Sequence, residues 1–175
     1  MKKNGLKFKK AFTLIETLVA ITILSAAVAG PMALSIKNIG IAAVSKDQLV
    51  AFYLGQEVIE YVRNVRDTNI LEESSVWLDG LENCKVNDSV GCYVDVKNNT
   101  VTDCGTGCPK LDFNGVNYTY KTDGTDGNSI FTRTVRIDDT VGVSGDEAKV
   151  SVSVKWTGKY GGKTVNLQDN IFNWR

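Results

Sequence analysis

A run of twenty consecutive residues without a charged side chain, from Thr17 to Ile36, constrains this chain more than any other feature. As a helix rising 1.5 Å per residue, the run is about 30 Å long, which matches the hydrocarbon core of a bilayer. The first ten residues contain five lysines and no acidic residue, which predicts that the N-terminus stays in the cytoplasm. The sequence therefore predicts a single-pass protein of the cell (inner) membrane, with the rest of the chain outside the cytoplasm.

We expect the apolar run to remain in the mature protein. A secretory signal has a small-residue cleavage site just after its apolar region. Here the small residues 26–30 lead into Pro31 and further helical pattern instead of the start of a separate domain. The run is therefore predicted to be an anchor and not a removable signal.

Glu16 lies at the head of this run. A carboxylate in a membrane segment costs about 2–3 kcal/mol on insertion scales, so a function is expected for it. The alternative is that the side chain reaches the lipid headgroups and is only an interfacial charge. In a dry bundle of apolar helices an isolated carboxylate is very unfavourable, so Glu16 would need a cationic partner there.

Residues 9–16, Lys-Lys-Ala-Phe-Thr-Leu-Ile-Glu, with the apolar run behind them, resemble the class III signal of type IV pilins and type II secretion pseudopilins. The resemblance implies that prepilin peptidase cleaves between Ala11 and Phe12. It also implies that Phe12 becomes N-methylated and that Glu16 is needed for assembly. The family usually has Gly where this chain has Ala11. Cleavage would expose the α-amine of Phe12, a cationic partner for Glu16 of the same or a neighbouring chain.

The resemblance divides the chain into three parts. These are a cleaved basic leader (1–11), the transmembrane and assembly half of a long helix (12–36), and a pilin-like globular domain (37–175). The whole chain has 20 basic and 20 acidic residues, and loss of the leader leaves 15 basic residues and a net charge of −5. This balance argues against nonspecific nucleic-acid binding, which needs a basic surface.

Helical periodicity continues beyond the apolar run. Apolar residues recur at helical spacing and form one stripe: Val50, Leu54, Val58, Tyr61 and Val65. The pattern stops at residues 67–69, so we predict a helix from Phe12 to about Arg66. Its first half is apolar all round and its second half is amphipathic. Pro31 is expected to kink the helix or remove one hydrogen bond.

The second half of the chain has the composition of a sheet. Twelve of the sixteen glycines lie between residues 80 and 162. Strands are predicted at 90–96, 116–121, 130–137, 148–156 and near 163–167. The strand at 148–156 is the clearest, because its alternate residues are Ala, Val, Val, Val and Trp.

A long helix with one apolar stripe, followed by an antiparallel sheet, predicts an α+β fold in which the sheet covers the stripe. The pilin resemblance implies the same layout. Residues 54–69 and the Val-rich strand ending at Trp156 resemble the minor pilin V and pseudopilin I group in particular.

All four cysteines, Cys84, Cys92, Cys104 and Cys108, lie within 25 residues. An even number in a domain outside the cytoplasm predicts two disulfide bonds. Three pairings are possible, and all three remain open at this stage. A zinc site is the competing interpretation, but the spacing lacks the Cys-x2-Cys pairs typical of such sites.

The chain offers little for catalysis. It contains no histidine, which excludes Ser–His–Asp and Cys–His catalysis and His-ligated metals. It also has no phosphate loop or nucleophile motif, so we expect no enzyme activity, metal or cofactor. Residues 123–128, Asp-Gly-Thr-Asp-Gly-Asn, could in principle bind calcium. They lack the distal Glu of an EF-hand, and a turn is favoured.

Two functional hypotheses follow. The first is a minor pilin or pseudopilin, a structural subunit that starts in the membrane and is polymerised through its helix. Its implied partners are other pilin or pseudopilin subunits, prepilin peptidase and the inner-membrane assembly machinery of a type IV pilus or type II secretion pseudopilus. The second is a pilin-like, membrane-anchored binding module, such as an adhesin or a DNA-uptake subunit.

Overall fold

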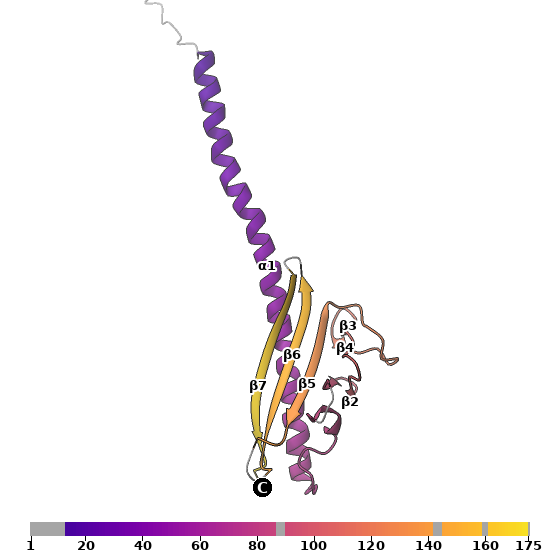
Figure 1. Cartoon of the computed structure of the whole chain (residues 1–175). Coiled ribbons are helices and arrows are strands. Elements are labelled where there is room, and N and C mark those ends of the chain that lie inside the picture. The colour runs from indigo at the N-terminus through magenta and orange to yellow at the C-terminus, as the bar shows by residue number, and fades with distance from the viewer. Residues whose placement is uncertain (1–12, 87–89, 142–144, 159–160, 175) are drawn as a thin grey trace, which may run out of the picture. The chain divides into compact units, whose positions relative to one another are not determined.

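The computed structural model describes residues 13–86, 90–141, 145–158 and 161–174. These residues form a long helix, α1 (Leu14–Leu71), a 3-10 helix, η1 (Glu82–Cys84), and strands that follow it (Figure 1). The strands are β1 (Cys92–Asp95), β2 (Thr100–Asp103), β3 (Asp112–Phe113), β4 (Tyr118–Thr119), β5 (Phe131–Asp138), β6 (Glu147–Gly158) and β7 (Gly161–Phe172). The predicted α+β fold, a long N-terminal helix followed by an antiparallel sheet, is confirmed.

A boundary between Val44 and Ser45 divides the chain into two compact units, and α1 contributes to both of them. The first unit holds the apolar part of α1. The second unit, which we call the head, holds residues 45–71 of α1 and every strand.

α1 continues through Pro31. Because proline has no amide hydrogen, one bond of the helical ladder is missing at this position. The hydroxyl of Ser35 donates to the carbonyl oxygen of Pro31 at 2.9 Å, one turn further along.

The predicted end of the helix near Arg66 is wrong, because α1 reaches Leu71. The helix is closed by Glu73, which adopts the left-handed conformation with φ of 55°. The amide of Ser74 donates to the carbonyl of Asn69 at 2.9 Å, as in a Schellman motif. The expected signal for this ending is a glycine, and none is present, so the sequence pattern placed the end too early.

The five-stranded antiparallel sheet has the order β2-β1-β5-β6-β7, and β3 and β4 form a separate hairpin. β5 pairs with β6 along its whole length, and β6 pairs with all twelve residues of β7. The predicted strands at 130–137 and 148–156 correspond to β5 and β6. β2 and β3 were not predicted, because β2 contains one apolar residue, Val101, and β3 contains one, Phe113, so neither shows an alternating apolar face.

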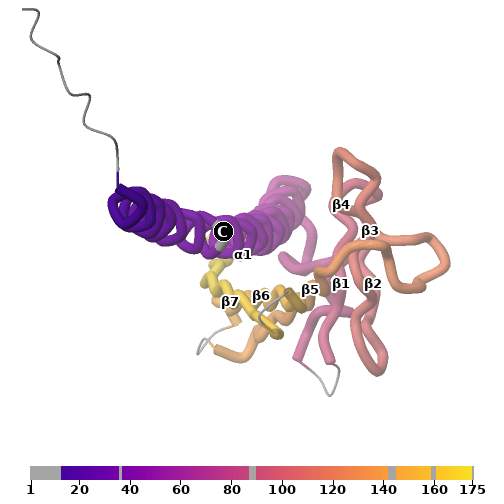
Figure 2. The backbone as a smooth tube through the Cα atoms, turned by 90° about the horizontal axis from the view of Figure 1, so that it is seen from above, coloured from indigo at the N-terminus to yellow at the C-terminus, as the bar shows by residue number. Residues whose placement is uncertain are grey.

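The core of the head lies between the second half of α1 and one face of the sheet. Alternate residues of β6 are buried as predicted: Ala148, Val150, Val152, Val154 and Trp156. They share one cluster with buried residues of α1, namely Ala51, Leu54, Val58, Ile59 and Val62. Seen from above, the sheet lies along one side of this part of the helix (Figure 2). A β carbon at Gly55 would lie 2.6 Å from Cδ1 of Leu167, so glycine lets α1 and β7 approach closely.

One charged side chain is built into this core. Arg133 of β5 points inward, on the face that also carries Phe131 and Val135, and is 1% exposed. Its guanidinium donates to Glu57 at 2.7 Å and to the carbonyls of Leu54 at 2.8 Å and Val94 at 2.6 Å. Because these partners belong to α1 and β1, Arg133 joins the helix to two strands of the sheet.

Replacing Arg133 should therefore destabilise the head. Arg133→Met leaves the hydrogen bonds to two carbonyls and a carboxylate unmade, and we expect a loss of about 3 kcal/mol in the free energy of unfolding. Glu57→Gln should cost about 1 kcal/mol, since Glu57 is partly hydrated and Arg133 keeps both carbonyl partners. Lys155→Met, at an exposed position of β6, is the matched control and should change stability by less than about 0.5 kcal/mol.

The measurement is denaturant unfolding of the detergent-solubilised full chain, followed by tryptophan fluorescence. Equal stability of Arg133→Met and Lys155→Met would show that the buried cation is dispensable.

Candidate assembly site

The first unit exposes an unusually large amount of apolar surface. Twelve large apolar side chains between residues 14 and 41 are more than half exposed. They are Leu14, Ile15, Leu18, Val19, Ile21, Ile23, Leu24, Val28, Met32, Leu34, Ile39 and Ile41. An apolar window within α1 is long enough to cross a membrane, and none of it is buried. A surface of this kind is an interaction site for lipid or for other chains.

Two threonine side chains in this segment are satisfied within the helix. The hydroxyls of Thr17 and Thr22 donate to the carbonyls of Leu14 and Val19, each at 2.8 Å. They therefore bring little unpaired polarity into an apolar environment. The charges that remain between residues 14 and 44 are those of Glu16 and Lys37.

Glu16 is the third residue of α1, and its side chain is exposed. Its amide donates to the hydroxyl of Thr13, the residue just before the helix, at a long 3.4 Å. Thr13-x-x-Glu16 is the spacing of a capping box, in which a threonine hydroxyl accepts from the third amide of the helix. The sequence interpretation missed this role of Thr13, although the T-x-x-E spacing was a sufficient signal. A carboxylate in the first turn is also stabilised by the positive end of the helix dipole.

Ala11 and Phe12, the predicted cleavage site and N-methylated residue, lie outside the described residues. Of the three residues predicted for processing and assembly, Glu16 alone lies among the described residues. The pairing of its carboxylate with a Phe12 amine stays a prediction.

The four cysteines form two bonds in the head, Cys84–Cys92 and Cys104–Cys108. The first joins the end of η1 to the start of β1, and both of its cysteines are fully buried. The second closes a short loop after β2. The amide of Cys104 donates to the carbonyl of Gly91 at 2.9 Å, so the two bonds lie close together at one end of the β1–β2 hairpin.

Tryptic peptides separate this pairing from the other two. Cleavage after Lys85, Lys97 and Lys110 places Cys84, Cys92 and the pair Cys104/Cys108 on three different peptides. The observed pairing links peptide 67–85 to peptide 86–97 and leaves peptide 98–110 with an internal bond, 2 Da below its reduced mass. We expect this pattern from non-reducing mass mapping of the exported protein. Any peptide joined to 98–110 would contradict it.

The polar side chains of the acidic turn at residues 123–128 form hydrogen bonds to nearby groups of the protein. Asp123 accepts hydrogen bonds from the amide and the hydroxyl of Thr125. The hydrogen bond from the amide holds the pKa of Asp123 below its ordinary value. Asp126 accepts from the amide of Lys110 at 3.0 Å, which lowers the pKa of Asp126 in the same way. Asn128 bonds both backbone groups of Phe113. Asp126 and Asn128 thus fasten the turn to Lys110 and to β3, as expected for a structural turn.

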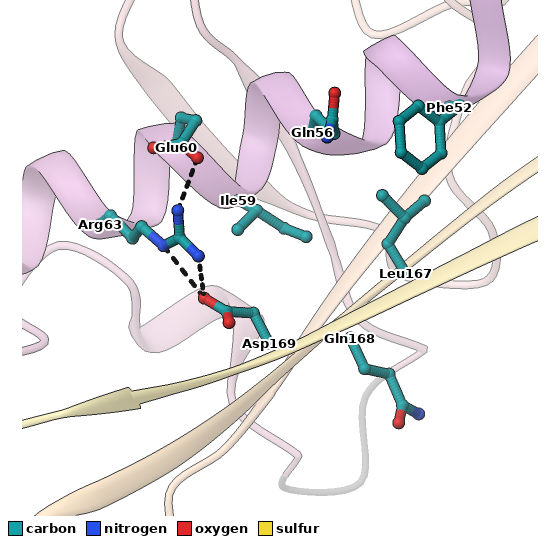
Figure 3. Close-up of a pocket in the computed structure, with 8 residues that line it drawn as sticks. All are labelled: Phe52, Gln56, Ile59, Glu60, Arg63, Leu167, Gln168 and Asp169. Carbon is teal, nitrogen blue, oxygen red and sulfur yellow. Dashed lines mark hydrogen bonds and ion pairs between the residues drawn. The ribbon is translucent and has the colours of Figure 1, made fainter. Parts of the chain in front are cut away.

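A groove of about 350 Å³ runs between the second half of α1 and β7 (Figure 3). Arg63 binds Glu60 at 2.6 Å and Asp169 at 2.9 Å, which ties the helix to this strand. Phe52 and Leu167 line the apolar end. The cation already has two carboxylate partners, and the groove is lined by residues that pack the helix against the strand.

A family model described as the prokaryotic N-terminal methylation motif matches residues 6–30. The matched segment contains the Ala11–Phe12 bond, Glu16 and the first fourteen residues of the twenty-residue apolar run. Neither the curated proteins nor the solved structures give a match to this chain. The motif is typical of structural subunits and not of enzymes, and the apolar N-terminal helix is compatible with single-pass membrane anchoring. Together they support a type IV pilin-like chain that is processed at its N-terminus.

Proposed function

We propose that this chain is a minor pilin or pseudopilin. It is inserted in the membrane as a precursor, processed by prepilin peptidase between Ala11 and Phe12, and polymerised through α1 into a type IV pilus or type II secretion pseudopilus. The observation that carries the proposal is a long apolar segment of α1, none of it buried, with one carboxylate, Glu16, at its head, inside the matched methylation motif.

Cleavage and assembly are chemically coupled in this scheme. Cutting the Ala11–Phe12 bond creates an α-amine four residues before Glu16, one helical turn away. In the bilayer the carboxylate can stay near the headgroups. In a bundle of apolar helices the same carboxylate needs a cation, and an incoming Phe12 amine can supply it at the correct axial position.

The first test is the mass of the intact mature protein. From a host with prepilin peptidase we expect the loss of residues 1–11 and one added methyl group on Phe12. An N-terminus still at Met1, or one that begins after Ala29 as a secretory signal would give, would overturn the proposal.

The second test is Glu16→Leu, with Ser25→Leu as the matched control in the same apolar segment. Both variants should insert in the membrane, since each makes the segment more apolar. Both should keep a folded head, because residues 16 and 25 lie outside that unit. Incorporation of Glu16→Leu into sheared filaments should fall at least about tenfold, because an incoming amine loses its carboxylate partner. Normal incorporation of Glu16→Leu would reduce Glu16 to an interfacial charge.

A further inference from the structure

Lys37 is the second charge in the apolar part of α1. Its side chain is exposed, and one turn away on either side lie Leu34 and Ile41, which are 63% and 62% exposed. Beyond Lys37 the helix continues with Ile39 and Ile41 before the next charged residue, Lys46. A lysine therefore interrupts apolar surface and does not mark its end.

The exposed apolar surface is longer than the hydrocarbon core of a bilayer. From Leu14 to Ile41 the helix rises about 40 Å, compared with about 30 Å for the hydrocarbon core. If residues 17–36 occupy the hydrocarbon core, Lys37 lies at the outer headgroups, and Ile39 and Ile41 lie beyond the core. Full coverage of the segment by apolar groups thus requires another chain, and that chain must also accommodate the lysine.

The two charges of this segment are opposite in sign, and their separation along the helix is fixed by the sequence. Glu16 and Lys37 are 21 residues apart, which is about 32 Å along the helix. At about 100° per residue, 21 residues return to within about 60° of the starting direction, so the two charges share one side of α1. Within a single α1 they are too far apart to meet.

From this arrangement we propose that α1 packs in parallel with α1 of a second copy of this chain displaced by about 32 Å along the helix axis. In that arrangement Lys37 of one copy forms an ion pair with Glu16 of the other. Copies placed around a common axis present the same side of the helix inward, and the displacement of about 32 Å brings the two charges to the same level. The inference rests on the proposed function and adds to it the identity and axial offset of one neighbour.

This pair and the Phe12 amine act on the same carboxylate. A carboxylate has two oxygens and can accept from both cations. Either cation alone balances the charge of Glu16, and the three groups together carry a net charge of +1. Lys37, which also needs a counter-ion in an apolar bundle, gains the Glu16 carboxylate through the same contact.

Zero-length crosslinking tests the proposal directly. A membrane-permeant carbodiimide applied to assembled wild-type protein joins a carboxylate to a lysine amine in contact with it, with loss of water. The expected product is a covalent dimer in which the Glu16 carboxyl is bonded to Nζ of Lys37, identified by peptide mass mapping. Because the two residues are about 32 Å apart within one helix, this bond can form only between copies.

Three variants control the experiment. Lys37→Arg keeps the charge but removes the reactive amine, so it should incorporate normally and lose the crosslink. Lys37→Gln should lose the crosslink, and its incorporation should fall about tenfold. Lys46→Gln removes a lysine of the head and should preserve both the crosslink and incorporation.

The outcomes separate this inference from the function on which it rests. Normal incorporation of wild type with no Glu16–Lys37 crosslink, or with Glu16 coupled solely to the Phe12 amine, overturns the 32 Å offset and leaves the pilin assignment standing. Normal incorporation of Lys37→Gln also overturns the offset. A wild-type chain that enters no filament overturns both.

Discussion

The exposed apolar surface of α1 between Leu14 and Val44 is the constraint on which the other features depend. Side chains such as Leu14 and Ile39 are more than two-thirds exposed in the single chain, so this helix is stable only where lipid or protein surrounds it. Lipid suits the uncharged stretch 17–36. A protein bundle suits the longer apolar surface, provided that Glu16 and Lys37 find opposite charges. The same segment can therefore serve as an anchor first and as an assembly element afterwards.

The head uses the other part of the same helix in a different way, as one side of a folded core. Beyond Ser45, α1 has one buried face, which includes Val58 and Val62, and the apolar residues of β6 cover this face. The buried Arg133 bridges Leu54, Glu57 and Val94 and thereby fixes how the helix lies on the sheet. The Cys84–Cys92 disulfide joins η1 to β1, and the Cys104–Cys108 disulfide closes the loop after β2. The core of the head therefore uses no residue of the apolar segment, as the proposed move from membrane to filament requires.

Features encoded by nearby residues could be predicted from the sequence, and features that depend on distant pairing could not. The apolar run, the amphipathic stripe and the period-two pattern of β6 are local, and each matched the structure. Arg133 lies two residues from Phe131 and two from Val135, on the same face of the strand, so its inward direction could have been predicted. Its partner Glu57 follows only from the packing of the helix on the sheet. The helix end at Leu71 was missed because Glu73 takes the place of a glycine. The disulfide pairing depends on the fold of the β1–β2 hairpin, which the spacing of the cysteines does not determine.

The central claim is that the bilayer covers only part of the apolar helix and that other chains cover the rest. Hydrogen–deuterium exchange of residues 38–44, measured on the membrane-inserted form and on assembled filaments, tests this directly. We expect these amides to exchange rapidly in the membrane form and at least about tenfold more slowly after assembly, while residues 17–36 are protected in both. Equal exchange of residues 38–44 in the two forms would contradict the account.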